Sequence, residues 1–342
     1  MKHSHPVIRR TALAMLASVC GSAWAATDAA AAKKTPAASK DKPWPTQPIK
    51  LLVGFPAGSV QDISARIIAE PLSTALGQPV VVENKPGASG AIAATAVAQA
   101  TDSHTFGVMN NSQLTVAKML NPRLAYDPAT DLAPVALIAT SPLVMVVGGR
   151  ATGTTPAQWL AWLSALSSKG NFGSPGVGTP GHLGMELIKS RVGGLQTTHI
   201  PYPGNPQVIN ALLSGEIHAA LLPPGLALPH IKAGTLRVVG TASETRSPLA
   251  PDLPTLREAS ISGVDLELIT ALAAPATISP AIRNKLGAAV IDVVKAPDTR
   301  QRLVTAGWRP TPSNFEGLSS KIRSETRILG GIIVIRNIRV ES

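Results

Sequence analysis

The sequence predicts an α/β protein of two lobes with mainly parallel sheets. Short β-rich runs alternate with helical stretches from Ile49 onward, a pattern typical of such sheets. The chain has 342 residues, 44% of them hydrophobic, so it is long enough for two domains with separate cores. A cleft between two lobes is the usual place for a small-molecule site. The expected strands are Ile49–Phe55, Val80–Glu83, Thr105–Met109, Leu143–Val147, Thr198–Pro201, Ile217–Leu222, Leu236–Thr241 and Val264–Leu272.

Helical signals lie between these strands. A helix is expected over Ile63–Leu76, closed by Gly77 where a left-handed C-cap favours glycine, with a kink at Pro71. Near the C-terminus, apolar residues recur at helical spacing and predict a helix packed on a sheet. They are Ile282, Leu286, Val290 and Val293.

The N-terminus has the order of a secretory signal. Lys2, Arg9 and Arg10 precede an apolar run over residues 11–19, and Ala23-Trp24-Ala25 forms an Ala-x-Ala cleavage site. We therefore expect a signal peptide over 1–25 and a periplasmic location. Residues 26–43 lack apolar periodicity and are expected to be a flexible leader.

The single cysteine precedes the expected cleavage site. Cys20 follows Val19, where a lipid-attachment signal needs a small residue, so lipidation is disfavoured. Cleavage after Ala25 leaves no cysteine for a disulfide or for thiol chemistry. No later stretch has about 18 uninterrupted apolar residues, the length typical of a membrane span.

The chain is basic, with a net charge of +11, which favours anionic partners without identifying one. Nucleic acid is disfavoured because aromatic residues make up only 3% of the chain and no basic helix or zinc-ligand spacing is present. The basic residues are scattered as on a solvated surface.

Three segments join a strand end to a glycine-bearing turn and a helix start. The first is Phe55–Asp62, and the second is the loop Gly173–Gly181. The third is His199–Pro206, in which Tyr202 either contacts a ligand or is simply packed. Helix N-termini offer unpaired N–H groups and the positive end of the helix dipole, which suit a carboxylate or phosphate.

Each segment also has a purely structural interpretation. Asp62 is favoured as a cap of its helix rather than a ligand contact. The second segment taken alone is as consistent with a surface loop as with a site. It is neither a Walker loop, because no Gly-Lys-Ser/Thr follows, nor a dinucleotide fingerprint.

Known catalytic patterns are missing. Gly87-Ala88-Ser89-Gly90 falls short of a Gly-x-Ser-x-Gly elbow. The histidines after the signal show no close metal-ligand spacing, so we expect no metal and no cofactor. A secreted hydrolase or another small-molecule enzyme using the same cleft is the alternative function.

These segments, in this order, resemble the tripartite tricarboxylate transporter substrate-binding family, the Bug-type periplasmic receptors. The resemblance covers the chain from Trp44 to the C-terminus, and its most specific runs are residues 77–88 and 229–234. The matching pieces are Trp44-Pro45, Pro48-Ile49, Phe55-Pro56 with Gly58 and Asp62, Leu76–Ala88, Tyr126-Asp127-Pro128, Pro201-Tyr202 with Gly204, Leu228–Gly234, Arg246-Ser247-Pro248, Pro251–Thr255 and Ala274-Pro275.

The resemblance implies a periplasmic binding protein of the Venus-flytrap, type II architecture, a monomer that holds a small carboxylate between its lobes and delivers it to separate membrane permease subunits. Lobe 1 would comprise 44–145 plus 265–342, and lobe 2 would comprise 146–264. Carried over by position, the ligand contacts would be Ala57, Gly58, Ser59, Asp62, Asn111 and Ser112 on lobe 1 and Ser174, Gly178, Thr179, His182, Tyr202, Gly204 and Asn205 on lobe 2.

Several positions depart from the family pattern. The usual Gly-Ser-Thr of the first loop is Ser59-Val60-Gln61, and Pro203 stands where a lysine is frequent. An aromatic pair expected near Ile269 and Thr270 is absent. His218 and Leu222 replace acidic residues common in the family. The departures favour a carboxylate without an amine, and they prevent ligand identity from being carried over from relatives.

Overall fold

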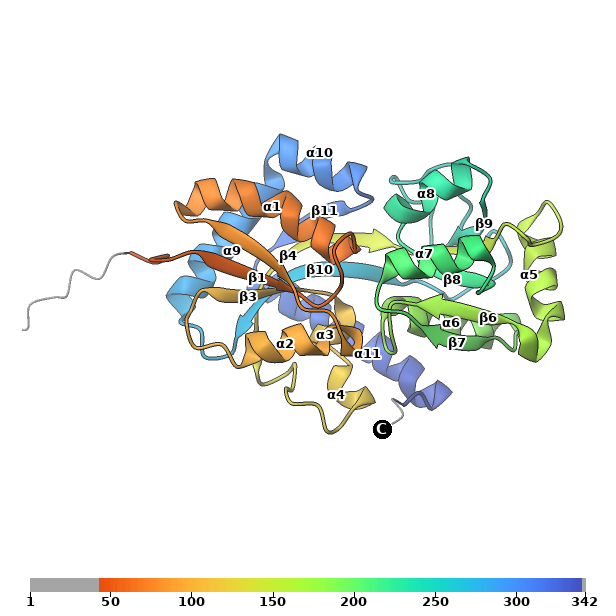
Figure 1. The fold of residues 1–342 in the computed structure, drawn as a ribbon, viewed down its shortest axis with the longest axis horizontal. Helices are drawn as coiled ribbons and strands as arrows, with labels where there is room; N and C mark the ends of the chain where they lie inside the picture. The colour runs from red at the N-terminus through yellow and green to blue at the C-terminus, as the bar shows by residue number, and fades with distance from the viewer. Residues whose placement is uncertain (1–42, 340–342) are drawn as a thin grey trace, which may run out of the picture. The chain divides into compact units, whose positions relative to one another are not determined.

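The computed structural model describes residues 43–339, which form two lobes, each built on one β-sheet (Figure 1). The expected signal peptide and all but Pro43 of the expected leader lie outside the described residues. The sheet of the first lobe has the order β11(Arg309–Ser313)-β4(Leu132–Pro142)-β10(Glu267–Pro275)-β3(Thr105–Met109)-β1(Ile49–Val53)-β2(Val80–Asn84). That of the second lobe has the order β7(Thr198–Pro201)-β6(Asn171–Ser174)-β8(Ala219–Leu222)-β5(Val144–Gly148)-β9(Leu236–Thr241).

The predicted two-lobed α/β fold is confirmed, but its two sheets are mixed rather than mainly parallel. Strands β2, β1 and β3 pair in parallel, as do β7, β6 and β8. The other pairs, among them β10 with β3 and β4 and β5 with β8 and β9, are antiparallel. The reason is the double crossing of the chain. Strand β4 carries the chain out of the first sheet and β10 brings it back beside β4, so the two run in opposite directions.

Helices cover both faces of each sheet. In the first lobe, α1(Val60–Leu76), α9(Pro280–Lys295) and α10(Pro297–Thr305) lie on one face, and α2(Ala91–Ala98), α3(Asn111–Leu114) and α11(Phe315–Arg336) on the other (Figure 1). The short helices η1(Ala88–Gly90) and α4(Ala117–Leu120) lie near α3. The second lobe carries α5(Pro156–Ala165), η2(Ser167–Lys169), α6(Pro180–Val192), α7(Asn205–Ser214) and α8(Pro224–Lys232).

The core follows the two-residue alternation of the strands. In β1, Leu51 and Val53 belong to the cluster under α1 and α9, whereas Leu52 belongs to the cluster under α2. Burial on both faces makes these strands continuously apolar.

The helical predictions near both ends are confirmed. Gly77 adopts φ +70° and donates its N–H to the Ser73 carbonyl at 3.0 Å, ending α1. Leu286, Val290 and Val293 of α9 are buried, and Ile282 packs against the same core. No helix within residues 43–339 is long and apolar enough to cross a membrane.

Candidate functional site

The first loop, between β1 and α1, is closed by its own side chains. Ser59 is the N-cap of α1, and its Oγ accepts the N–H of Asp62 at 3.3 Å. The Asp62 carboxylate in turn accepts the N–H of Gly58 at 2.9 Å, where φ is +77°. This reciprocal pair resembles a capping box. The capping residue is therefore Ser59, and Asp62 lies three residues further along.

Asp62 is only 3% exposed and has several partners. Its Oδ1 accepts from Arg66 Nε and from Asn84 Nδ2, both at 2.9 Å. Burial acts to raise the pKa of Asp62, but the hydrogen bonds from Arg66, Gly58 and Asn84 outweigh it and hold that pKa below its usual value. Its carboxylate therefore serves the fold of the first loop.

The second loop, between β6 and α6, is also held by short-range bonds. Thr179 Oγ1 and Ser174 Oγ both donate to the Gly176 carbonyl, at 2.8 and 2.9 Å. His182 Nδ1 accepts the N–H of Gly178 at 3.0 Å. Ser174, Thr179 and His182 are buried and shape the loop rather than project from it.

Two stacked histidines lie beneath this loop. The rings of His182 and His199 are 3.8 Å apart at 18°, next to Phe172, and His199 Nε2 lies 2.7 Å from Ser174 Oγ. Burial, with a smaller contribution from Lys189, lowers the pKa of His182 to about 4. Burial, followed by the charge of His182, lowers the pKa of His199 to about 3. Both rings are therefore neutral at ordinary pH.

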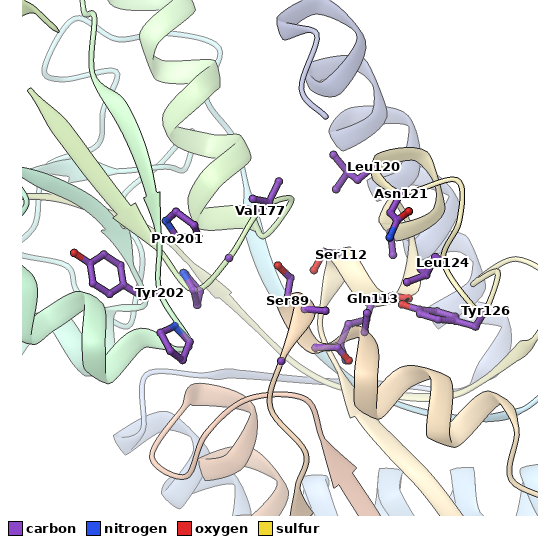
Figure 2. Close-up of a pocket in the computed structure, with 18 residues that line it drawn as sticks. Ser89, Ser112, Gln113, Leu120, Asn121, Leu124, Tyr126, Val177, Pro201 and Tyr202 are labelled. Carbon is purple, nitrogen blue, oxygen red and sulfur yellow. Dashed lines mark hydrogen bonds between the residues drawn. The ribbon is translucent and has the colours of Figure 1, made fainter. Parts of the chain in front are cut away.

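The third loop leads from β7 into α7. Gly204 is the N-cap of α7, and Asn205 begins the helix with only 5% exposure. The hydroxyl of Tyr202 donates to Glu216 at 2.7 Å, and Figure 2 shows it directed away from the first lobe. Burial first, then Glu216, raises the pKa of Tyr202 to about 12. Tyr202 therefore offers its ring, not its hydroxyl, to the space between the lobes.

The polar side chains of the turn at the end of β3 also form hydrogen bonds within the protein. Asn110 caps α3, and its Oδ1 accepts from Ser112 Oγ at 2.9 Å. Asn111 Nδ2 donates to Glu325 at 2.8 Å and to the Glu267 carbonyl at 3.0 Å. Asn111 thus ties α3 to α11 and β10.

The three loops meet where the lobes touch. A Cβ at Gly204 would lie 3.0 Å from Pro56 of the first loop, and one at Gly58 would lie 3.9 Å from Pro206 of the third. Added Cβ atoms at Gly176 and Gly178 would overlap Ser89 and Leu120. These overlaps and the positive φ angles favour glycine at Gly176 and Gly178.

A small cavity of about 20 Å³ lies among the helix N-termini. Val60 and Gln61 of α1 line it, as do Thr179, Pro180 and Gly181 at the start of α6 and Asn205 of α7. Its volume suits a single water molecule.

A larger cavity of about 480 Å³ also lies between the lobes (Figure 2). The second lobe contributes residues 175–177 and 201–203, and the first lobe contributes residues 87–91 and parts of 112–126. None of the described residues that line it is charged, and Pro175 lines both cavities.

Only four of the thirteen residues predicted as ligand contacts line one of these cavities. Thr179 and Asn205 line the small cavity, and Ser112 and Tyr202 line the large one. The remaining nine line neither cavity. They are Ala57, Gly58, Ser59, Asp62, Asn111, Ser174, Gly178, His182 and Gly204.

Sequence reasoning missed much of the large cavity's wall. Ser89, Leu120, Asn121, Leu124 and Tyr126 line it. As a possible site, the glycine-rich run around Ser89 was considered only as a nucleophile elbow. Positive φ angles at Ala88 and Ser89 mark it instead as a tight turn in the wall.

A second contact joins the lobes through the C-terminal helix. Leu329, Ile332 and Ile333 of α11 share an apolar cluster with Leu183 of α6. Arg336 donates to Glu186 of α6 at 3.1 and 3.2 Å. Of the described residues, no group of three or more His, Cys, Asp or Glu is placed to hold a metal ion.

Known proteins share this arrangement. The chain is 34% identical to the Cupriavidus necator "UPF0065 protein in gbd 5'region" over 85% of this chain and 88% of that protein. A solved R. palustris structure with adipate is 27% identical and matches with a TM-score of 0.82 over 86% of this chain and 99% of its own. MatC from Rhodopseudomonas palustris, with bound malate, is 27% identical and matches with a TM-score of 0.78 over 85% and 100%.

The two sheets, the double crossing and the cavities between the lobes define a two-lobed solute receptor of the periplasmic-binding-protein class. Residues 64–338 match the family model described as "Tripartite tricarboxylate transporter family receptor". The chain belongs to this family.

Proposed function

We propose that this receptor captures a small carboxylate without an amine between its lobes and delivers it to the membrane permease subunits of a tripartite transporter. The observation that carries the proposal is the convergence of two helix N-termini, those of α6 and α7, on one small cavity with no acidic side chain in its lining. The N-termini of α6 and α7 have no acidic residue in their first turn and no side-chain cap among the described residues. They are suited to an anionic oxygen.

We place the hinge at the two crossings, with lobe 1 as 44–145 plus 265–342 and lobe 2 as 146–264. The strands of the six-stranded sheet come from 49–142 and 267–313, and those of the five-stranded sheet come from 144–241, which supports these bounds. Because the small cavity has room for about one water, the lobes must separate to admit a carboxylate and close over it.

The family is one of periplasmic receptors, and we infer export with cleavage near Ala25. Adipate and malate in two related structures support a carboxylate ligand. No observation favours the hydrolase alternative. Ser174 Oγ does lie beside His199, but Ser174 is fully buried and lines neither cavity.

A thermal-shift panel tests the proposal. It compares carboxylates with their matched amides and with amino acids, all on the folded receptor. A carboxylate at a hundred times its dissociation constant is expected to stabilise the protein by about 2.7 kcal/mol. Its amide should give no shift, because it lacks the charge that the helix N-termini favour. Larger shifts from amino acids than from any simple acid would contradict the proposal, as would equal shifts from acid and amide.

A further inference from the structure

The walls of the large cavity point to the chemical class of the ligand's body. We infer that the receptor selects carboxylic acids whose body is mostly hydrocarbon, aromatic or alkyl, over hydroxylated di- and tricarboxylic acids. This inference rests on the proposed function, since it assumes that a carboxylate is held at the helix N-termini.

Apolar groups make up most of the cavity wall. Ala91, Leu120 and Leu124 come from the first lobe, and Val177, Pro201 and Pro203 come from the second (Figure 2). The volume of about 480 Å³ lies within the usual range for small-ligand sites. A hydrocarbon body placed here would be removed from water on both sides.

Most polar side chains in the wall are already paired within the protein. Gln113 Nε2 donates to the Gly90 carbonyl at 3.0 Å, and its Oε1 accepts the Asn110 N–H at 3.1 Å. The hydroxyl of Tyr126 donates to the Gln113 carbonyl at 3.0 Å, and that of Tyr202 is bound to Glu216.

Few side-chain partners therefore remain for hydroxyl groups on a ligand. Ser89 Oγ and the amide nitrogen of Asn121 form no hydrogen bond with the described residues, and both side chains line the cavity (Figure 2). Each ligand hydroxyl buried without a partner would weaken binding by roughly tenfold.

The position of the cavity suits the body of an acid bound at the helix N-termini. Pro175 lines both cavities, and Ser112 and Gln113 of the large cavity follow closely on Asn110 of the small one. A ligand with its carboxylate beside Thr179 and Asn205 would extend past Pro175 into the apolar space.

Isothermal titration of the mature receptor with two sets of acids tests the inference. Benzoate, 3-phenylpropanoate and hexanoate have apolar bodies, whereas malate, tartrate and citrate carry hydroxyl groups. We expect the tightest apolar acid to bind at least tenfold more tightly than any hydroxy acid. If a hydroxy acid bound most tightly, the inference would be overturned and the proposed function would stand. If neither set bound, the proposed function would fail and the inference with it.

A nearly isosteric substitution locates the effect in this cavity. Val177→Thr adds one hydroxyl to the wall and should weaken the tightest apolar acid about three- to tenfold, while hydroxy acids change less than twofold. Leu124→Asn makes the same test from the first lobe. The matched control is Val81→Thr, at a 46% exposed valine of β2 outside both cavities, which should change neither set. Equal weakening of both sets by Val177→Thr, with an unchanged melting temperature, would place the ligand body elsewhere.

Discussion

The N-terminus of α1 in the first lobe and the N-termini of α6 and α7 in the second are built differently. Helix α1 has a side-chain cap, Ser59, and a carboxylate in its first turn, Asp62. The N-cap residues of helices α6 and α7 are Thr179 and Gly204, and these helices have neither feature in the described structure. All three face the same small cavity.

This difference in helix N-termini indicates which lobe offers the more positive electrostatic potential to an anion. In α1 the carboxylate of Asp62 compensates the helix dipole from within the protein, so little remains for a ligand. In α6 and α7 the N–H groups of the first turn are left uncompensated. We infer that the second lobe supplies most of the attraction for a carboxylate and that the first lobe closes over it.

The largest expected difference between the first and second loops is in how their contributions to folding stability change with pH. The second loop rests on two neutral histidines, whose pKa values of about 4 for His182 and about 3 for His199 lie below the usual 6.5. Because the unfolded chain binds these protons first, stability should decline as the pH falls below about 6.5. Between pH 8 and pH 5 the loss is about 2 kcal/mol for each histidine.

Urea unfolding across this pH range measures the loss. His199→Gln removes one titrating ring and should flatten the profile. Asp62 of the first loop contributes only at lower pH, since its lowered pKa keeps it ionised throughout this window. An unchanged slope in His199→Gln would show that the buried pair does not control acid stability.

A carboxylate placed at the start of α6 should make its N-terminus resemble that of α1, where Asp62 compensates the helix dipole. Thr179→Asp introduces a negative charge at the N-cap, which compensates the helix dipole and repels an anionic ligand. We expect a loss of about 2 kcal/mol in binding the tightest carboxylate, roughly thirtyfold. Thr179→Asn has the same shape without the charge and should lose fivefold at most. Equal losses in the two variants, measured by titration calorimetry, would contradict the electrostatic account.

The cap of α1 should affect stability and not affinity. Ser59→Ala removes the acceptor for the Asp62 N–H and should lower the free energy of unfolding by about 1 kcal/mol, with ligand affinity unchanged within twofold. Ser279→Ala is the matched control, because Ser279 caps α9 with the same 3.3 Å bond at an exposed position. A larger loss of affinity in Ser59→Ala than in Ser279→Ala would place the first loop in direct contact with the ligand.

Much of the fold could be predicted from local pattern. Thr105–Met109, Thr198–Pro201 and Leu236–Thr241 are strands with the predicted bounds. Three strands were not predicted. Only one residue separates strand β4 from β5, so the apolar run that contains both was predicted as a strand only over its last residues. The other two lack a strand pattern. Strand β11 contains two prolines, which only an edge strand tolerates, and β6 merges into the glycine loop that follows it.

The site was harder to predict because side-chain direction depends on distant partners. Composition located the glycine loops, but it could not show that Thr179 and Ser174 donate back to Gly176. Asn111 is directed to Glu325, 214 residues away, and no local signal indicates that bond. The wall of the large cavity joins segments from both lobes, so its apolar character appears only after folding.

The contact between α11 and α6 lies where it could serve as a pivot for the lobe movement that we propose. Leu329, Ile332 and Ile333 belong to the last helix of the first lobe but are buried against Leu183 of the second, and Arg336 is bound to Glu186. Separation of the lobes must either expose this cluster to water or rotate about it. We therefore expect the final turns of α11 to help set the balance between the open and closed forms of the empty receptor. Changes there would alter apparent affinity without touching either cavity.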